Sequence, residues 1–196
     1  MNPAPNTNYD KQKQQPPSKD CCTDSSRTPL EITAEELEEY TDSVRARIRL
    51  KNGEFFRNRD ARYTKIIVQE FLNAAQKTFY VFCGKLNQLV YEPLLANFML
   101  AHDRGVDIRV ITEASCTNIE SPTLANWLKT INSLRHYKRG KIPHFILADG
   151  QMYRLEVDEG RKAAIVCAHA ESNPEATQTV GAMKAIHQHL WSQSSH

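Results

Sequence analysis

An alternation of amphipathic helices and short apolar strands in the middle of the chain most constrains its fold. Apolar residues recur at helical spacing over 61–76 and again over 92–103. Each stretch leads into a strand-like run, TFYVFC at 78–83 and VDIRVIT at 106–112, and Gly105 suits the left-handed position that ends a helix. Short links of this kind favour neighbouring parallel strands joined by a right-handed crossover. The sequence therefore predicts an α/β domain.

A β-hairpin and a closing helix follow in the second half of the chain. The dipeptide Asp-Gly at 149–150 supplies the positive φ angles of a tight turn, and it divides two strand-like runs within 144–157. Another apolar run, at 163–168, predicts a further strand, and Asn173 begins a helix that ends near residue 191. Together these elements predict a single domain with a mixed sheet flanked by helices.

Two segments of different character precede this domain. Residues 1–31 are rich in Asn, Pro, Gln, Lys and Ser and contain few large apolar residues, so we expect a disordered tail. A capping-box pattern at Thr33 predicts a charged helix over 33–50, which is a candidate docking element for a protein partner. We expect this helix and its linker to occupy 32–60 and the α/β domain to occupy 61–196.

Several compositional features exclude a membrane span and a disulfide framework. No apolar run approaches the roughly 18 residues that cross a bilayer, and the N-terminus lacks the apolar core of a signal peptide. The cysteines number five, an odd count, and Cys83 and Cys167 lie in apolar runs, which indicates reduced thiols. These features predict a cytoplasmic protein that does not enter a membrane.

The net charge of +2 is uninformative, but the basic residues are clustered. The first cluster contains Arg45, Arg47, Arg49, Lys51, Arg57, Arg59, Arg62 and Lys65, and the second contains Arg135, Lys138, Arg139 and Lys141. Such clusters can neutralise phosphates, so DNA or RNA is a candidate partner. The alternative is a solvated helix face followed by a charged loop.

Over about 61–191 the order of elements and three local motifs resemble the phospholipase-D-like superfamily. The run AHDRGVDIRVIT is similar to the second helix and strand of that family, and HFILADG is similar to the strand that carries its active site. The stretch from Asn-Pro-Glu-Ala-Thr to His-Leu-Trp is similar to its closing helix. The resemblance implies a phospholipase-D-like domain of the nuclease type with a single motif.

The family motif is H-x-K, four residues, then D. The resemblance implies that its histidine attacks phosphorus, that its lysine stabilises the phosphate charge, and that no cofactor is required. A second copy of the motif comes from a repeat or a dimer partner, so the single motif of this chain implies a homodimer.

The motif of this chain departs from that pattern. When Asp149 takes the place of the family aspartate, His144 stands at the lysine and Ile142 at the histidine. Isoleucine cannot attack phosphorus. The alternative frame makes His144 the nucleophile but leaves Ile146 at the lysine and Gln151 at the aspartate.

The candidate catalytic residues are therefore His144, Asp149 and His169, although the turn already explains Asp149 and a surface position would explain His169. The candidate binding residues are Lys138, Arg139, Lys141, Arg57, Arg59, Arg62 and Asn173, the last of which is also explained as a helix cap. We expect no metal site, because His187 and His189 are two residues apart on a helix and point about 200° apart.

Two functions remain open. The first is a catalytically degenerate module that binds nucleic acid or protein and acts in regulation. The alternative is a metal-independent phosphodiesterase or nuclease that uses His144, with His169 of either subunit as the acid and with Lys141 or Arg139 as the phosphate-stabilising group.

Overall fold

The computed structural model describes residues 32–58, 60–113, 120–138, 142–158 and 163–194. The predicted disordered tail, 1–31, lies outside the described residues, as do the predicted binding residues Arg59, Arg139 and Lys141.

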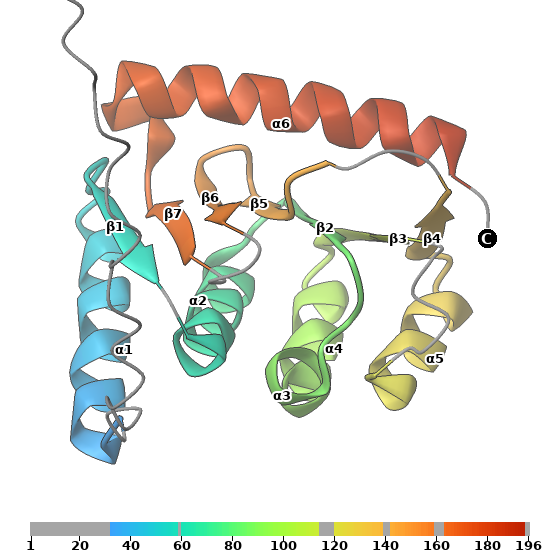
Figure 1. Ribbon diagram of the computed structural model, residues 1–196, viewed down its shortest axis with the longest axis horizontal. Helices are drawn as coiled ribbons and strands as arrows, with labels where there is room; N and C mark the ends of the chain where they lie inside the picture. Colours follow the sequence, from blue (N-terminus) through green and yellow to red (C-terminus); the bar gives the residue numbers. More distant parts are fainter. Residues whose placement is uncertain (1–31, 59, 114–119, 139–141, 159–162, 195–196) are drawn as a thin grey trace, which may run out of the picture. The chain divides into compact units, whose positions relative to one another are not determined.

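Seven strands form one mixed sheet in the order β1-β7-β6-β5-β2-β3-β4 (Figure 1). The strands are β1 (Phe55–Asn58), β2 (Thr78–Cys83), β3 (Asp107–Glu113), β4 (Leu134–Tyr137), β5 (Phe145–Ala148), β6 (Met152–Asp158) and β7 (Ala163–Cys167). Strands β2, β3 and β4 are parallel, and every other neighbouring pair is antiparallel. The sheet therefore changes from parallel to antiparallel between β2 and β5.

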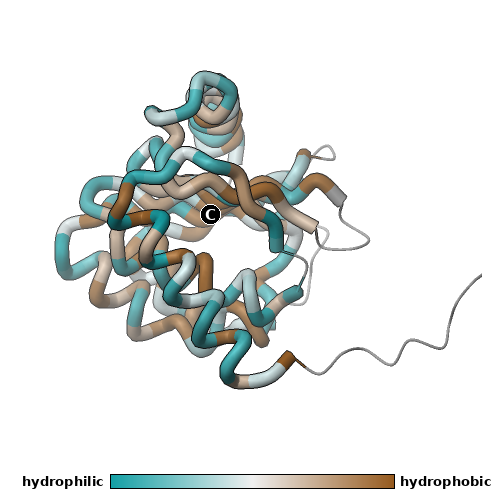
Figure 2. Tube along the Cα trace, turned by 90° about the vertical axis from the view of Figure 1, so that its left-hand side faces the viewer, coloured by the Kyte–Doolittle hydropathy of each residue, from teal (hydrophilic) through white to brown (hydrophobic). Residues whose placement is uncertain are grey.

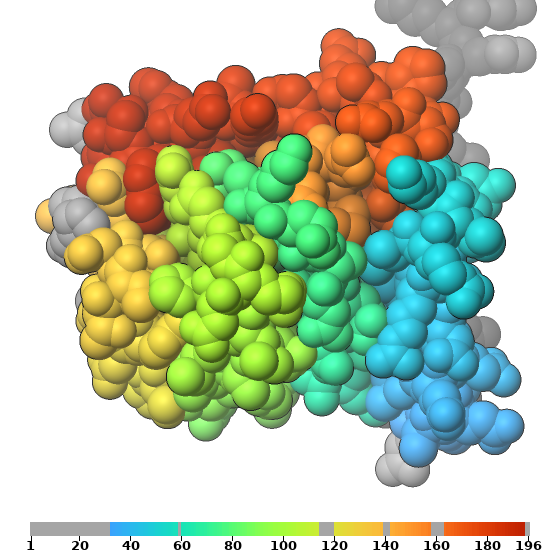
Figure 3. All heavy atoms as spheres, turned by 180° about the vertical axis from the view of Figure 1, so that it is seen from behind, coloured from blue at the N-terminus to red at the C-terminus, as the bar shows by residue number. Residues whose placement is uncertain are grey.

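Helices cover the sheet unequally on its two faces. The helices are α1 (Ala34–Arg49), α2 (Ala61–Ala74), α3 (Gln88–Tyr91), α4 (Leu95–Asp103), α5 (Pro122–Thr130) and α6 (Pro174–Gln193), with short 3-10 turns η1 (Glu92–Leu94) and η2 (Ala170–Ser172). Figure 3 shows α1, α2, α4 and α5 side by side on one face. The long helix α6 alone crosses the other face, as the end-on view in Figure 2 also shows.

This arrangement divides the core into two layers. Val81, Ile146 and Val110 point toward α1–α5, in a cluster that includes Phe71 and Phe98. Their strand neighbours point the other way, so that Phe82, Ile111, Phe145 and Leu147 pack with Met183 and Leu190 of α6. The alternation is the period-2 pattern of a sheet that is buried on both faces.

The turn and cap signals of the sequence are confirmed. Thr33 and Glu36 form a reciprocal capping box at the start of α1. Asp149 and Gly150 have φ angles of 54° and 66°, which are the positive values that a tight primed turn requires. Gly105 follows α4 with a φ of 84°.

Other local features differ from the expectation. Strands β1 (FFRN) and β4 (LRHY) were not predicted, because both are short, charged edge strands that gain their order from pairing with β7 and β3. The helix expected from residue 92 begins with the 3-10 turn η1. The dipeptide Ser121-Pro122 is a typical helix start, and α5 does begin at Pro122. The Ser121 hydroxyl nevertheless does not cap the helix, since it is buried without a hydrogen bond among the described residues.

Helix α1 is attached to the domain by a charged contact. Arg45 donates two hydrogen bonds of 3.0 Å to the carboxylate of Glu70 on α2. In the described part of the chain, no helix is both long and apolar enough to cross a membrane.

Candidate functional site

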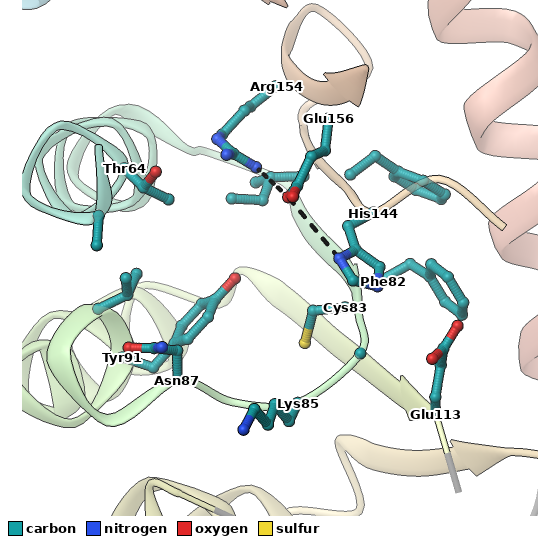
Figure 4. A pocket seen from close by; sticks show the side chains of 15 residues that line it. Thr64, Phe82, Cys83, Lys85, Asn87, Tyr91, Glu113, His144, Arg154 and Glu156 are labelled. Carbon is teal, nitrogen blue, oxygen red and sulfur yellow. Dashed lines mark hydrogen bonds and ion pairs between the residues drawn. The ribbon is translucent and has the colours of Figure 1, made fainter. Parts of the chain in front are cut away.

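A pocket of about 330 Å³ opens where the parallel strands β2 and β3 end and the antiparallel strand β5 begins (Figure 4). Ligands of α/β proteins commonly bind at this edge, where the direction of the sheet changes. His144 lies at the start of β5, and Gly84 and Glu113 lie at the ends of β2 and β3. We call this edge, with its pocket, the carboxyl edge.

A chain of polar side chains runs behind the pocket. The side-chain amide of Asn58 donates to Thr64 at 2.7 Å, and the Arg154 Nε donates to the Asn58 Oδ1 at 3.2 Å. The Arg154 guanidinium then contacts the Glu156 carboxylate at 3.4 Å. The same carboxylate lies 3.7 Å from the His144 Nδ1. The imidazole is therefore the pocket-side end of a buried network, and it is 20% exposed.

This network sets the charge of Glu156. Burial alone would raise the pKa of this carboxyl, but the nearby His144 imidazole and the positive charge of Arg154 outweigh it and lower the pKa below the ordinary value. Glu156 is therefore ionised at neutral pH and can hold the Nδ1 side of the imidazole.

Gly84 gives the imidazole room at the end of β2. A Cβ atom at this position would lie 3.0 Å from the Cε1 of His144 and 3.1 Å from its Nε2, which is closer than side chains normally approach. The glycine therefore permits the His144 ring to lie against the backbone at the end of β2, where the ring lines the pocket.

Ile142 does not reach this pocket. It packs against the buried cluster beneath α6, as do Tyr137 and Leu155. Ile142, the residue that the sequence predicts at the position of the attacking histidine, is thus an apolar side chain on the α6 side of the sheet.

The other predicted catalytic residues, Asp149 and His169, occupy the opposite edge. Asp149 accepts hydrogen bonds of 2.8 Å from the backbone N–H groups of Gln76, Lys77 and Thr78, so it joins the hairpin to the start of β2. His169 follows β7, and its Nδ1 contacts the Ser172 hydroxyl at 3.0 Å.

Asn173 lies at the same edge and has a structural contact on each side of its amide. Its Oδ1 accepts from the N–H groups of Glu175 and Ala176 at the start of α6, and its Nδ2 donates to the carbonyl of Gly53. Within one chain, His144 therefore does not meet Asp149, His169 or Asn173.

The described basic candidates are closer to the carboxyl edge. Lys138 is exposed and directly follows β4, which is parallel to β3. Arg62 is exposed in the first turn of α2, where its guanidinium contacts Asp60 at 3.0 Å, and Arg57 is exposed on β1. In the pocket itself, Lys85 forms an ion pair with Glu120.

Sequence reasoning missed the residues that hold His144. Arg154 and Glu156 occupy alternate positions of β6, and a pair of charges on one side of a mostly apolar strand is the signal that could have suggested a buried pair. Thr64 and Tyr91 also line the pocket, and both lie in stretches that read as ordinary helix. Among the described residues no group of three His, Cys, Asp or Glu side chains could hold a metal ion.

No profile of a known sequence family matches the chain, and no curated protein is similar to it in sequence. Several solved structures are similar in fold. The archaeal chromatin protein TrmBL2, described as showing a novel mode of DNA binding, superposes with a TM-score of 0.54 at 14% identity over 82% of this chain. The chain spans 64% of the length of TrmBL2.

Two further structures match with similar TM-scores. The phospholipase D family member Nuc from Salmonella typhimurium has a TM-score of 0.52 at 11% identity, and NucT from Helicobacter pylori has a TM-score of 0.53 at 12% identity. Each covers 72% of this chain, which in turn covers 95% of Nuc and 98% of NucT. The resemblance seen in the sequence is thus confirmed at the level of structure, and the chain has the phospholipase-D-like fold.

Proposed function

We propose that the chain is a non-hydrolytic phospholipase-D-like module that binds nucleic acid at its carboxyl edge. The observation that carries the proposal is the position of Ile142. This residue aligns with the attacking histidine, has no nucleophilic atom, and packs on the α6 side of the sheet. The fold is retained while the group that would form a phosphohistidine is missing.

Nucleic acid is the partner that the surroundings of the edge favour. Exposed Lys138 and Arg62 lie on elements that end or begin there, and cationic side chains bind phosphates without regard to sequence. TrmBL2, which shares the fold, is a DNA-binding protein by its description. The proposed binding surface also includes Arg57 and three further basic residues predicted from the sequence, Arg59, Arg139 and Lys141.

The test is a binding titration with labelled single- and double-stranded DNA and RNA in chelator. We expect intact, retarded probe and an affinity that falls steeply with salt. The double variant Lys138→Glu/Arg62→Glu reverses two charges at this edge. It should bind every sequence more weakly, and its affinity should depend less on salt. The matched control reverses Lys129 and Lys184, which are exposed on α5 and α6, two helices that do not line the pocket. Equal losses in both double variants would contradict the proposed surface.

A metal-independent phosphodiesterase is the second candidate, because the imidazole of His144 lines the pocket and is held by Glu156 in the way a catalytic base is oriented. This candidate predicts shortened probe in chelator and loss of that turnover in His144→Ala. Turnover that survives the substitution would exclude His144, and the absence of turnover favours the binding module.

The single motif also leads us to propose a homodimer, with α1 as a docking element for another protein. Helix α1 presents exposed Glu35, Glu38 and Glu39 and is fixed to α2 by Arg45. Light scattering on the purified chain tests the dimer, since a monomer mass at all concentrations would contradict it.

A further inference from the structure

The pocket contains a tyrosine hydroxyl for which the described residues supply no hydrogen-bond partner. Tyr91 is only 6% exposed, lines the pocket, and makes no hydrogen bond among the described residues. Figure 4 shows its hydroxyl directed toward the interior of the pocket. Burial raises the pKa of Tyr91, so the group is protonated at neutral pH and can both donate and accept. The hydroxyl of this largely buried side chain opens into the pocket, where a bound molecule can be its hydrogen-bond partner.

Two further pocket groups have hydrogen-bonding capacity that the described protein does not use. The Oδ1 of Asn87 accepts from the N–H of Leu89, while its side-chain N–H groups make no hydrogen bond among the described residues. Glu113 has neither a cation nor a hydrogen-bond donor against its carboxylate among the described residues. A ligand can therefore meet donors at Asn87 and Tyr91 and an acceptor at Glu113.

The charge balance of the pocket disfavours an anionic group as that ligand. The guanidinium of Arg154 is bound by Glu156 and Asn58, and the ammonium of Lys85 is paired with Glu120. Both cations of the pocket are thus matched by carboxylates, and Glu113 adds a further negative charge. Among the described side chains that line the pocket, a phosphate would therefore find no arginine or lysine without a carboxylate partner.

The remaining walls are apolar or aromatic. Phe82, Phe145, Ile146 and Val90 line the pocket, and its volume lies within the range of small-molecule sites. A planar, uncharged ring that carries N–H donors on one edge and carbonyl or ring-nitrogen acceptors on another would complement these walls and polar groups together.

We propose that this pocket binds an unstacked nucleobase, in a single-stranded nucleic acid or in a free nucleoside. The oligonucleotide form rests on the proposed function, with the basic residues of the edge holding the backbone and the pocket holding one base. Guanine fits best, because its adjacent N1–H and N2–H donors suit a carboxylate and its O6 and N7 acceptors suit Asn87 and Tyr91.

The experiment compares a short oligonucleotide built entirely of abasic sites with the same backbone carrying one internal guanine. We expect the wild-type chain to bind the guanine form at least about fivefold more tightly, as for one base taken up by a protein. In Tyr91→Phe this ratio should fall severalfold, while the affinity for the abasic backbone stays unchanged. Tyr63→Phe is the matched control, because Tyr63 contacts Tyr40 outside the pocket.

Glu113→Gln tests how the base is read. Replacing guanine by hypoxanthine removes the N2 amine, and we expect the wild type to lose affinity severalfold while Glu113→Gln discriminates little between the two bases. A guanine that adds no affinity over the abasic backbone, or a ratio that Tyr91→Phe leaves intact, would overturn the proposal.

If neither oligonucleotide binds, the proposed nucleic-acid function fails and the free nucleoside decides the pocket. Guanosine is then titrated into the chain while the His144 ring resonances are followed by NMR. Shifts in the wild type that are lost in Tyr91→Phe would support a nucleoside pocket, and unchanged resonances would overturn it.

Discussion

The two ends of β5 carry polar residues that the sequence offers as one active site, yet the structure gives them different tasks. At one end, Asp149 is committed to three backbone N–H groups. At the other, His144 lies in a pocket at the end of a network of side chains. Five residues of extended chain separate them by about 16 Å. A motif that spans one strand can therefore place a residue with a structural role at one end and a residue of the candidate site at the other.

The largest effect should come from the network behind His144. Arg154 is 5% exposed and holds Glu156 and Asn58, so Arg154→Leu leaves a buried carboxylate without its cation. We expect the free energy of unfolding to fall by about 3–5 kcal/mol in denaturant titrations. Arg62→Leu, which removes an exposed arginine from an ion pair, should scarcely change it. A loss below about 1 kcal/mol in Arg154→Leu would contradict a stabilising role for the network behind His144.

The turn end should respond in stability alone. Asp149→Ala removes the acceptor of three N–H groups and places alanine at a φ of 54°, so we expect a loss of about 2–3 kcal/mol. Asp149→Asn keeps one oxygen and tolerates that backbone, and it should lose less. Oligonucleotide affinity should be the same in both variants and the wild type. A loss of oligonucleotide affinity in Asp149→Asn alone would contradict the separate roles assigned to the two ends of β5.

The free energy of unfolding should depend on pH through Glu156 at the pocket end of β5. The Asp149 variants should show the same dependence. Because the pKa of Glu156 is lowered in the folded chain, its ionised form stabilises the fold at pH values above its ordinary value of 4.5. That contribution is lost as the pH falls below 4.5 through the folded pKa. Unfolding free energies measured from pH 7 to pH 3 should therefore fall more steeply in the wild type than in Glu156→Gln. Parallel curves would contradict the charge assigned to Glu156.

The smallest stability effect should come from His144 itself. Its side chain is partly exposed, and its contact with Glu156 is a long one, so His144→Gln should change the free energy of unfolding by less than about 1 kcal/mol. The same variant should weaken oligonucleotide binding severalfold, because the ring lines the pocket. His169→Gln, at the opposite edge, should alter neither property. Equal binding by the two variants would remove the distinction between the edges.

Local chemistry made much of the fold predictable. The capping box at Thr33, the turn at 149–150 and the helical periodicity of α2 each depend on neighbouring residues, and each appears in the structure. Strands β1 and β4 lacked such signals, because their order comes from distant partners.

The site was less predictable for the same reason. His144 could be chosen from the strand that contains it, but Arg154 and Glu156 become its partners only through the register of β6 against β5. Tyr91 and Glu113 reach the pocket from two other elements. No spacing along the chain encodes a convergence of this kind.

The pairing of β1 with β7 has a consequence for biosynthesis. Phe55 pairs with Cys167, so the strand that the first sheet strand pairs with in the described structure lies more than a hundred residues later. At about 5–20 residues per second, a ribosome needs roughly 5–20 s to make the intervening segment. During that interval the backbone of Phe55–Asn58 has no strand beside it, and two adjacent phenylalanines are available to other nascent chains. Strand β1 therefore stays unpaired until β7 has been synthesised. Slower translation after β1 should lengthen the period in which this segment can aggregate.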